Sequence, residues 1–236
     1  MKKHLLLGLI ALSTLLTACS NDDDNDPGTI LGNAVNCDYA PYSLGSTFTF
    51  ENKSYDQYSG QWQTSLSTNE VVEITTYLGE TWAVIQGQQQ IGGSAEGLAR
   101  CSEYGLTLLS KSLEINGQTI TDQEFPMLKL PATVGKTWAS EPIEFDVMGF
   151  TNKVTYVFEI IGVNQTQTIA GVTYNEVVEV EERTVTEIDG FPPYEGTKTT
   201  RYYDKEAGLI SSVITFSNFV WTDTLVVSNL IDYDIQ

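Results

Sequence analysis

The chain has 236 residues and is strongly acidic, with 31 Asp and Glu against 12 Lys and Arg and a net charge of −19 at pH 7. Phosphate backbones and anionic membrane surfaces repel such a chain, which argues against any nucleic-acid partner. The length is sufficient for one large β domain or two small ones, each able to bury a core.

The first 18 residues have the pattern of a signal peptide. A basic start precedes an apolar run over residues 5–16. This run is too short to span a bilayer as a helix, which takes about 20 residues. It ends in "LTAC" (16–19), which resembles the lipobox of bacterial lipoproteins. The resemblance implies that Cys19 is acylated on its sulfur and becomes the mature N-terminus. The alternative is an ordinary secreted protein with an unpaired Cys19.

An acidic and amide-rich segment follows Cys19 directly: Ser20, Asn21, Asp22, Asp23 and Asp24. It resembles the export signal of Bacteroidota surface lipoproteins. The resemblance implies an outer-membrane protein that faces the cell exterior, with the membrane as its partner through the lipid on Cys19. As a calcium loop, the segment lacks the Gly and the terminal Glu of an EF-hand. We therefore predict a signal peptide (1–18), an acidic flexible tether (19–36) and a β-rich domain (37–236).

From residue 39 onward, short runs rich in β-branched and aromatic residues alternate with turn clusters, which predicts strands. The clearest runs span 46–52, 70–77, 81–87, 153–163, 172–188, 197–204, 208–216 and 219–231. Asn116-Gly117 between β-formers predicts a hairpin, and 87–94 is predicted to be a loop. No stretch of ten or more residues has a helical period, so helix should be confined to a turn or two. Short links between strands favour an antiparallel sheet.

Two cysteines, Cys37 and Cys101, remain after lipidation of Cys19. An exported compartment permits disulfides, and two cysteines allow one internal pairing. We predict this disulfide, with two buried free thiols as the alternative. The sequence has no CxxC motif, which argues against a redox-active site.

Two pairs of segments are similar within the chain. "LGSTFTFE" (44–51) resembles "VGKTWASE" (134–141), and "ARCSEYGLTLLS" (99–110) resembles "TRYYDKEAGLISS" (200–212). In the second pair, an Arg precedes a turn, a Gly-Leu step and a strand that contains Ser. The common order indicates a tandem duplication with candidate halves 39–125 and 126–236. Chance similarity between β-rich segments is the alternative.

The second half also carries "GKTW" (135–138), followed by "YYDKEAGLI" (202–210). This spacing resembles a pattern in envelope lipoproteins of the LolA/LolB carrier type, whose antiparallel sheet curls into an open barrel. The resemblance covers 135–210 and implies a fold rather than site residues. The predicted fold class is all-β with little helix, as a curled antiparallel sheet that forms an open barrel or a sandwich.

Few catalytic chemistries are open to the mature chain. The only histidine, His4, is lost with the signal peptide, which excludes imidazole-based mechanisms. Cys37 and Cys101 cannot supply a usual zinc ligand set, and no phosphate-binding glycine motif occurs. The acidic run at 175–190 offers paired carboxylates for glycoside hydrolysis, but a solvated strand face explains it better. We predict no enzyme activity, no metal site and no cofactor.

Aromatic residues suggest a binding role. Trp62 and Tyr194 lie in turn-like sequence, and planar rings on a β face can stack on sugars, so both are candidate ligand contacts. Trp82, Trp138 and Trp221 lie in apolar patterns and are predicted to be core. The leading hypothesis is a non-catalytic binding module for glycan or apolar cargo. A structural envelope component that docks a protein partner is the alternative, and a glycosidase-like carboxylate enzyme is third.

Overall fold

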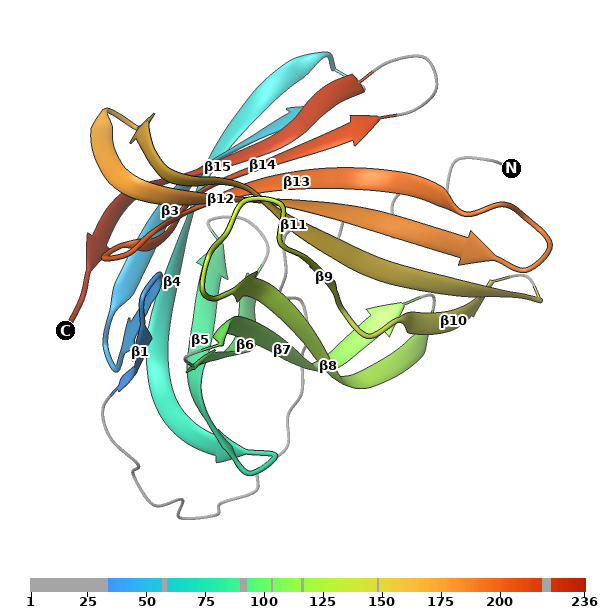
Figure 1. Ribbon diagram of the computed structural model, residues 1–236, viewed down its shortest axis with the longest axis horizontal. Coiled ribbons are helices and arrows are strands. Elements are labelled where there is room, and N and C mark those ends of the chain that lie inside the picture. Colours follow the sequence, from blue (N-terminus) through green and yellow to red (C-terminus); the bar gives the residue numbers. More distant parts are fainter. Residues whose placement is uncertain are drawn as a thin grey trace.

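Figure 1 shows the computed structural model of the chain, which describes residues 34–56, 59–89, 93–102, 104–115, 117–147, 149–217 and 222–236. Over these ranges the chain forms fifteen strands and no helix, so none of them contains a helix that could cross a membrane. The predicted all-β class is confirmed.

The strands follow one another with short turns. Their bounds are β1 (Ala34–Cys37), β2 (Ala40–Ser43), β3 (Thr47–Asp56), β4 (Gln61–Tyr77), β5 (Glu80–Gln89), β6 (Gly93–Ser102), β7 (Gly105–Ile115), β8 (Gln118–Lys129), β9 (Thr137–Ala139), β10 (Ile143–Val147), β11 (Phe150–Ile169), β12 (Val172–Ile188), β13 (Tyr194–Asp204), β14 (Gly208–Ser217) and β15 (Thr222–Asp234). The hairpin predicted at Asn116-Gly117 joins β7 to β8. The predicted loop at 87–94 is too long, because β5 extends to Gln89 and β6 begins at Gly93.

One antiparallel sheet contains all strands except β1 and β2, which form a small hairpin of their own. Its order is β10-β11-β12-β13-β14-β15-β3-β4-β5-β6-β7-β8, and β9 pairs with β11 beside β10. Two meanders of consecutive strands are thus joined where β15 pairs with β3. Because strands twist and coil, the sheet curls and brings its edge strands β8 and β10 together (Figure 1).

Side chains, rather than a backbone ladder, bridge the seam between β8 and the β9–β10 segment. The bonds run from the Trp138 indole N–H to Pro126 O, from Gln123 Nε2 to Glu141 O (3.4 Å), and from Asp146 N to Gln118 Oε1 (2.7 Å). Pro126 has no backbone N–H, so β8 could not donate to a neighbouring strand at that position. The sheet is therefore a nearly closed barrel, which agrees with the open-barrel prediction.

The two meanders begin in the same way, at the segments whose sequences are similar. Gly45 N donates to Val71 O, and Gly135 N donates to Ile160 O, each at 2.8 Å. In the return direction, Val71 N donates to Ser46 O at 2.9 Å, and Ile160 N donates to Lys136 O at 3.0 Å. Both glycines have positive φ, 87° and 82°, which other residues rarely adopt. Residues 44–51 and 134–141 therefore occupy equivalent structural positions.

The second pair of similar segments aligns less well. The turn from Ser102 to Gly105 is one residue shorter than the turn from Asp204 to Gly208. Arg100 lies two residues before the strand end at Ser102, whereas Arg201 lies three residues before the strand end at Asp204. Because side chains alternate between faces, this odd difference in spacing places the two matched arginines on opposite sides of the sheet. Arg201 points into the barrel, whereas Arg100 lies on its outer surface with Glu80 and Glu124. Matching Arg100 to Arg201 was therefore wrong.

Two predicted boundaries also shift. The division between 125 and 126 falls inside β8, and the second meander begins after the 130–136 segment. Strand β1 includes residues 34–36, which the prediction assigned to the tether, because Ala34 already pairs with Ser43 of β2. Cys19 and the segment from Ser20 to Asp24 lie outside the described residues.

Aromatic and aliphatic side chains fill the barrel. The main cluster includes Phe125, Trp138, Tyr156, Phe158 and Tyr203, and the indole of Trp138 stacks on Phe158 with 5.6 Å between ring centroids. Buried and half-buried positions alternate along β11, as expected for a strand with one face on the core. Trp82 and Trp138 are buried as predicted, and Trp221 lies outside the described residues.

The β1–β2 hairpin covers one end of the barrel, which we call the capped end. Tyr39 N donates to Lys205 O at the β13–β14 turn, and the side chains of Val35, Tyr39 and Ala40 belong to the core. A disulfide joins Cys37 to Cys101 on β6, with 5.7 Å between the Cα atoms. The predicted pairing is therefore present and ties the hairpin to the wall of the barrel.

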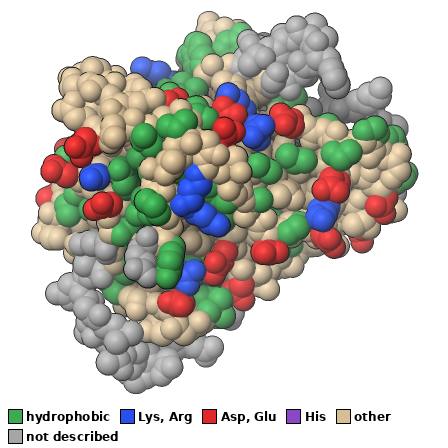
Figure 2. Space-filling view, in the orientation of Figure 1, with side chains coloured by type: hydrophobic (Ala, Val, Ile, Leu, Met, Phe, Trp, Pro, Cys, Tyr) green, Lys and Arg blue, Asp and Glu red, His purple; other side chains and the backbone are tan. Residues whose placement is uncertain are grey.

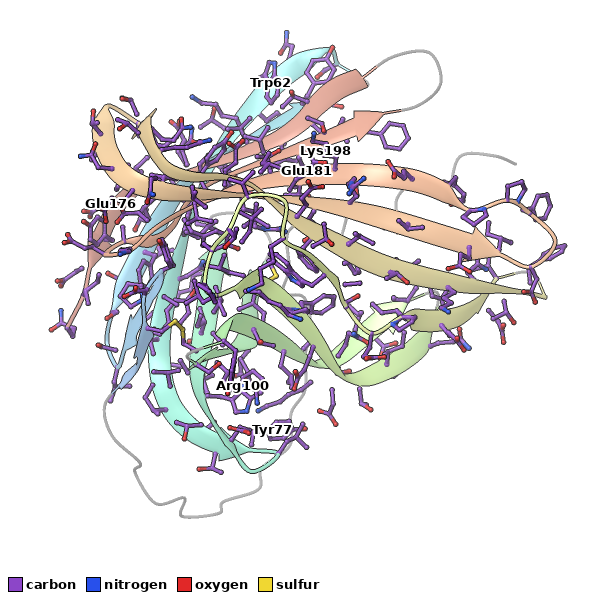
Figure 3. All side chains as sticks on the ribbon, viewed as in Figure 1. Trp62, Tyr77, Arg100, Glu176, Glu181 and Lys198 are labelled. Carbon is purple, nitrogen blue, oxygen red and sulfur yellow. A yellow bond between two sulfur atoms is a disulfide. The ribbon has the colours of Figure 1, made fainter. Side chains whose placement is uncertain are left out.

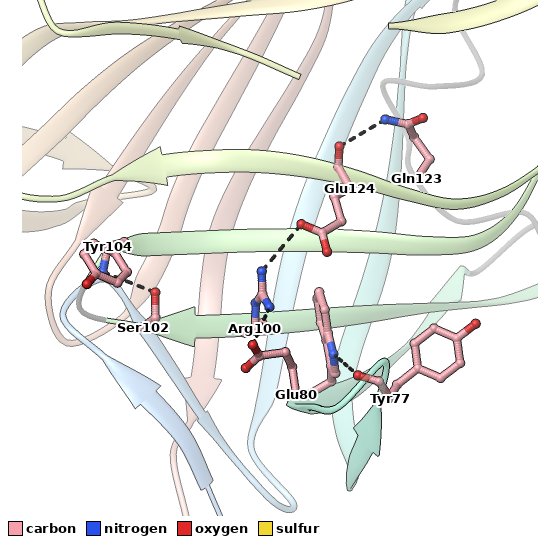
Figure 4. A network of polar contacts seen from close by, with 8 residues as sticks. Tyr77, Glu80, Arg100, Ser102, Tyr104, Gln123 and Glu124 are labelled. Atoms are coloured by element: carbon pink, nitrogen blue, oxygen red, sulfur yellow. Dashed lines mark hydrogen bonds and ion pairs between the residues drawn. The ribbon is translucent and has the colours of Figure 1, made fainter. Parts of the chain in front are cut away.

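A small cluster covers the outer surface of β5–β7. Trp82 is fully buried there, and its indole N–H donates to Tyr77 O at 2.9 Å (Figure 4). The Arg100 guanidinium lies 4.8 Å from the centre of the Trp82 ring and forms ion pairs with Glu80 and Glu124. The ion pairs in this region therefore hold an arginine over a buried indole.

Candidate binding face

The opposite end of the barrel, which we call the distal end, carries an aromatic pair in which one ring is exposed and the other is half-buried. Tyr55 on β3 and Trp62 on β4 face each other across the strand pair. Their ring centroids are 5.5 Å apart and the planes are inclined by 54°. Trp62 is 49% exposed, and Figure 3 shows it at the margin of the molecule. An exposed indole supported by a second ring can present a flat apolar surface to a ligand.

Tyr194, the second predicted contact, begins β13 at a different hairpin of the distal end. It is 41% exposed. Close to it in the chain, Phe191 contacts Phe150 edge to face, with 6.2 Å between ring centroids. In the sheet, β14, β15 and β3 separate β13 from β4. The structure therefore does not bring Tyr194 and Trp62 into one aromatic row.

Sequence reasoning missed three aromatic residues, Tyr55, Phe150 and Phe191. Tyr55 could have been found, because it lies in the same turn-like segment as Trp62 and a hairpin places the two rings opposite each other. Phe150 and Phe191 belong to separate hairpins, and only the register of β11 on β12 brings these hairpins together.

A continuous row of outward side chains crosses the sheet next to the aromatic pair. Strand register gives it as Thr64, Lys53, Val227, Val213, Thr200, Glu181 and Glu159, one residue from each strand from β4 to β11. Two residues further toward the distal end, the same strands present Trp62 and Tyr55 at one side and Lys198 and Arg183 at the other. We call this surface the outer face.

Ion pairs organise the charged side of the outer face. Arg183 lies 3.3 Å from Glu159, 3.6 Å from Glu181 and 3.7 Å from Glu195. Lys198 pairs with Glu181 and keeps 47% of its side chain exposed. Figure 2 shows basic and acidic side chains side by side on this part of the surface. Three carboxylates thus surround two cations, and parts of both charges remain accessible.

The other acidic residues of 175–190 lie in several environments. Glu182 points into the barrel and pairs with Arg201 at 2.6 Å, whereas Glu176 pairs with Lys205 at 3.7 Å. Burial, followed by the negative charge of Glu179 and a hydrogen bond to that carboxylate, raises the pKa of Tyr202 to about 12. No group of three His, Cys, Asp or Glu residues suited to a metal ion occurs among the described residues.

A pocket of about 360 Å³ lies at the capped end of the barrel. Asp38 and Tyr39 of the β1–β2 turn line it, together with Lys205, the 130–132 segment, Val163, Asn164 and Val178. Lys205 lies 3.9 Å from Asp38, so the main charges of the pocket neutralise each other. This pocket is separate from the aromatic pair at the distal end.

Comparison with one solved structure supports the fold. Neither the family models nor the curated proteins include a match. A crystal structure of a proposed lipoprotein from Parabacteroides distasonis is similar over 84% of this chain and 98% of its own, with a TM-score of 0.51 and 15% identity. A proposed exported protein with a YmcC-like fold from Bacteroides fragilis matches over 84% and 99%, with a TM-score of 0.44 and 10% identity. The resemblance to LolA/LolB carriers stays a prediction.

Proposed function

We propose that this protein is a non-catalytic glycan-binding module of the cell envelope, and that Tyr55 and Trp62 form its primary contact with sugar. The observation that carries this proposal is the exposed Trp62 ring packed against Tyr55 on the β3–β4 strand pair, with 5.5 Å between the ring centroids. Sugars have apolar C–H faces and hydroxyl edges. A ring beside hydroxyl and charged groups, here Thr64 and Lys53, can satisfy both.

We also propose that the lipid on Cys19 anchors the protein in the outer membrane, with the domain facing the exterior. The lipobox-like "LTAC" and the acidic segment after it support this localisation. The names of the two similar structures, a proposed lipoprotein and a proposed exported protein, are compatible with it. A tether of 14 residues between Cys19 and Ala34 would extend at most about 50 Å, which allows the domain to reach glycans near the membrane.

Glycan is a better candidate than apolar cargo. A cargo carrier needs an apolar cavity, but aromatic and aliphatic side chains of the protein itself fill the barrel around Trp138 and Phe158. The pocket at the capped end has charged residues, Asp38 and Lys205, in its lining. The exposed rings of the distal end therefore offer the better recognition surface.

Binding of the mature chain to a glycan array tests the proposal, with Cys19→Ser to keep the protein free of lipid. Binding that Trp62→Ala abolishes and Trp62→Phe partly retains would support a stacking contact. Tyr104→Ala is the matched control, because Tyr104 is an exposed aromatic residue at a turn of the capped end. Absence of binding to every glycan, or equal binding by Trp62→Ala, would refute the proposal.

The Phe150–Phe191 contact favours a second candidate function, docking of an envelope protein. These residues and Tyr194 are 48%, 60% and 41% exposed, and they share one region of the distal end with Pro192 and Pro193. Exposed apolar clusters often mark protein contacts. Crosslinking in cells from position 191 would identify such a partner, and a Phe191→Ser variant should reduce its recovery.

A further inference from the structure

We propose that the glycan site continues across the strands from Trp62 to Lys198 and Arg183, and that it selects long, uncharged polysaccharides. This inference rests on the proposed function and extends it along the outer face. Figure 3 shows Trp62, Lys198 and Glu181 in succession across the sheet. The aromatic pair would hold one end of the bound segment, and the ion-pair cluster would hold the other.

Strand register establishes that the two ends belong to one surface. The row from Thr64 to Glu159 has an unbroken set of cross-strand partners through six neighbouring pairs. Adjacent strands lie about 4.8 Å apart, so the four intervals from Trp62 on β4 to Lys198 on β13 span about 19 Å. This distance exceeds the size of a single sugar ring, and only an oligosaccharide could contact both ends at once.

The side chains of the row that lies between the two ends are small or short. The row itself contains Val227, Val213 and Thr200. Thr215 lies beside Lys198, and the Thr215 hydroxyl donates a hydrogen bond to Lys198 O at 3.3 Å. None of these side chains is large enough to interrupt a ligand that lies flat on the sheet. A polysaccharide can therefore lie without interruption on the surface between the aromatic pair and the ion-pair cluster.

The charges of the ion-pair cluster indicate which type of polysaccharide would bind. Glu159, Glu181 and Glu195 outnumber Arg183 and Lys198, so the cluster carries a net charge of −1. Carboxylates and guanidinium groups can bond to sugar hydroxyls, but the excess negative charge repels uronic acids and sulfated sugars. The acidic chain as a whole adds to this repulsion. An uncharged polysaccharide therefore fits this surface better than an anionic one.

The test compares affinity with ligand length in the mature Cys19→Ser chain. The probes are cello-, manno- and malto-oligosaccharides from disaccharide to octasaccharide, with polygalacturonate as the anionic probe, and titration calorimetry provides the affinities. We expect the octasaccharide of the recognised series to bind about tenfold more tightly than its trisaccharide, and polygalacturonate to bind at least about tenfold more weakly.

Variants separate the two ends of the site. Lys198→Gln should weaken octasaccharide binding several-fold and leave trisaccharide binding unchanged, whereas Trp62→Ala should abolish both. Lys111→Gln is the matched control, because Lys111 is a half-exposed lysine that pairs with Glu96 on β6, outside the outer face.

Each outcome distinguishes the extended site from the primary contact. Equal affinity for short and long probes, or no effect of Lys198→Gln, would overturn the extension while the contact at Trp62 stands. Tight binding of polygalacturonate would overturn the preference for uncharged chains. Failure of the wild type to bind any probe would overturn both the extension and the proposed function.

Discussion

Glu182 and Arg201 form an ion pair inside the barrel, with 2.6 Å between Glu182 Oε2 and Arg201 Nη1. Only 9% and 6% of their side chains are exposed. Burial by itself lowers the pKa of Arg201, but the Glu182 carboxylate more than compensates and holds it above its ordinary value. The Arg201 guanidinium is therefore charged at neutral pH and depends on the Glu182 carboxylate for compensation.

Removal of one partner should destabilise the protein strongly. Glu182→Gln would leave the buried Arg201 without a counter-charge, at an expected cost of about 3–5 kcal/mol in the free energy of unfolding. The double variant Glu182→Leu/Arg201→Met should lose much less, because it buries no unpaired charge. Urea unfolding followed by circular dichroism measures both. A double variant as unstable as Glu182→Gln would contradict this explanation.

The Cys37–Cys101 disulfide should contribute substantially to stability. It closes a loop with a sequence separation of 64 residues, which corresponds to about 4 kcal/mol in the chain-entropy model. Reductant should therefore lower the urea midpoint of the wild type. In the Cys37→Ser/Cys101→Ser variant, reductant should have no effect and the midpoint should already be low. Equal midpoints for the oxidised wild type and the double variant would refute this contribution.

Stability should decrease above pH 10 because of buried tyrosines. Burial raises the pKa of Tyr42 from 10.0 to about 12, and burial also raises the pKa of Tyr156 and Tyr203. Since these groups ionise more easily in the unfolded chain, their contribution is complete below pH 10 and is lost as pH rises toward the folded-state values.

Thermal melts between pH 8 and pH 12, with tyrosinate absorbance as a second signal, measure this loss. Tyr42→Phe removes one of the groups and should make the alkaline decline shallower. A decline of the same steepness in Tyr42→Phe and wild type would show that Tyr42 does not contribute.

A buried and an exposed tryptophan should respond differently to truncation. Trp138 is 7% exposed, stacks on Phe158 and donates across the seam to Pro126, so Trp138→Ala should cost about 3–5 kcal/mol. Trp62 is half-exposed, and Trp62→Ala should change stability by no more than about 1 kcal/mol. Urea unfolding provides both values. A large loss for Trp62→Ala would mean that weaker glycan binding by this variant reflects misfolding.

Local sequence patterns predicted the elements of this fold but not their arrangement. Alternating apolar residues located β11, and Asn116-Gly117 located the β7–β8 turn, because both signals depend on near neighbours in the chain. The similarity of the segments around Gly45 and Gly135 also corresponded to a structural equivalence. Register is different, since a shift of one residue reverses every side chain. Arg100 and Arg201 therefore could not be placed on their faces from sequence.

The candidate site was only partly predictable for the same reason. Exposure of Trp62 follows from its polar surroundings and from a nearby turn, which are local features. The alignment of Trp62 with Lys198 depends on the pairing of β15 with β3, which joins the first and last parts of the chain. No short-range pattern specifies that pairing. The seam bonds of Trp138 and Gln123 depend equally on closure of the whole sheet.

The proposed anchor can be tested separately from the folded domain. Cys19→Ser should abolish labelling with radioactive palmitate and release the protein from the membrane fraction, because the sulfur that accepts the lipid is missing. Cys101→Ser is the control and should keep its label. Replacement of Asp22, Asp23 and Asp24 with alanine should preserve labelling but remove sensitivity to protease added to intact cells. Palmitate labelling of Cys19→Ser would exclude Cys19 as the lipidated residue, and protease sensitivity of the alanine variant would exclude the acidic segment as the export signal.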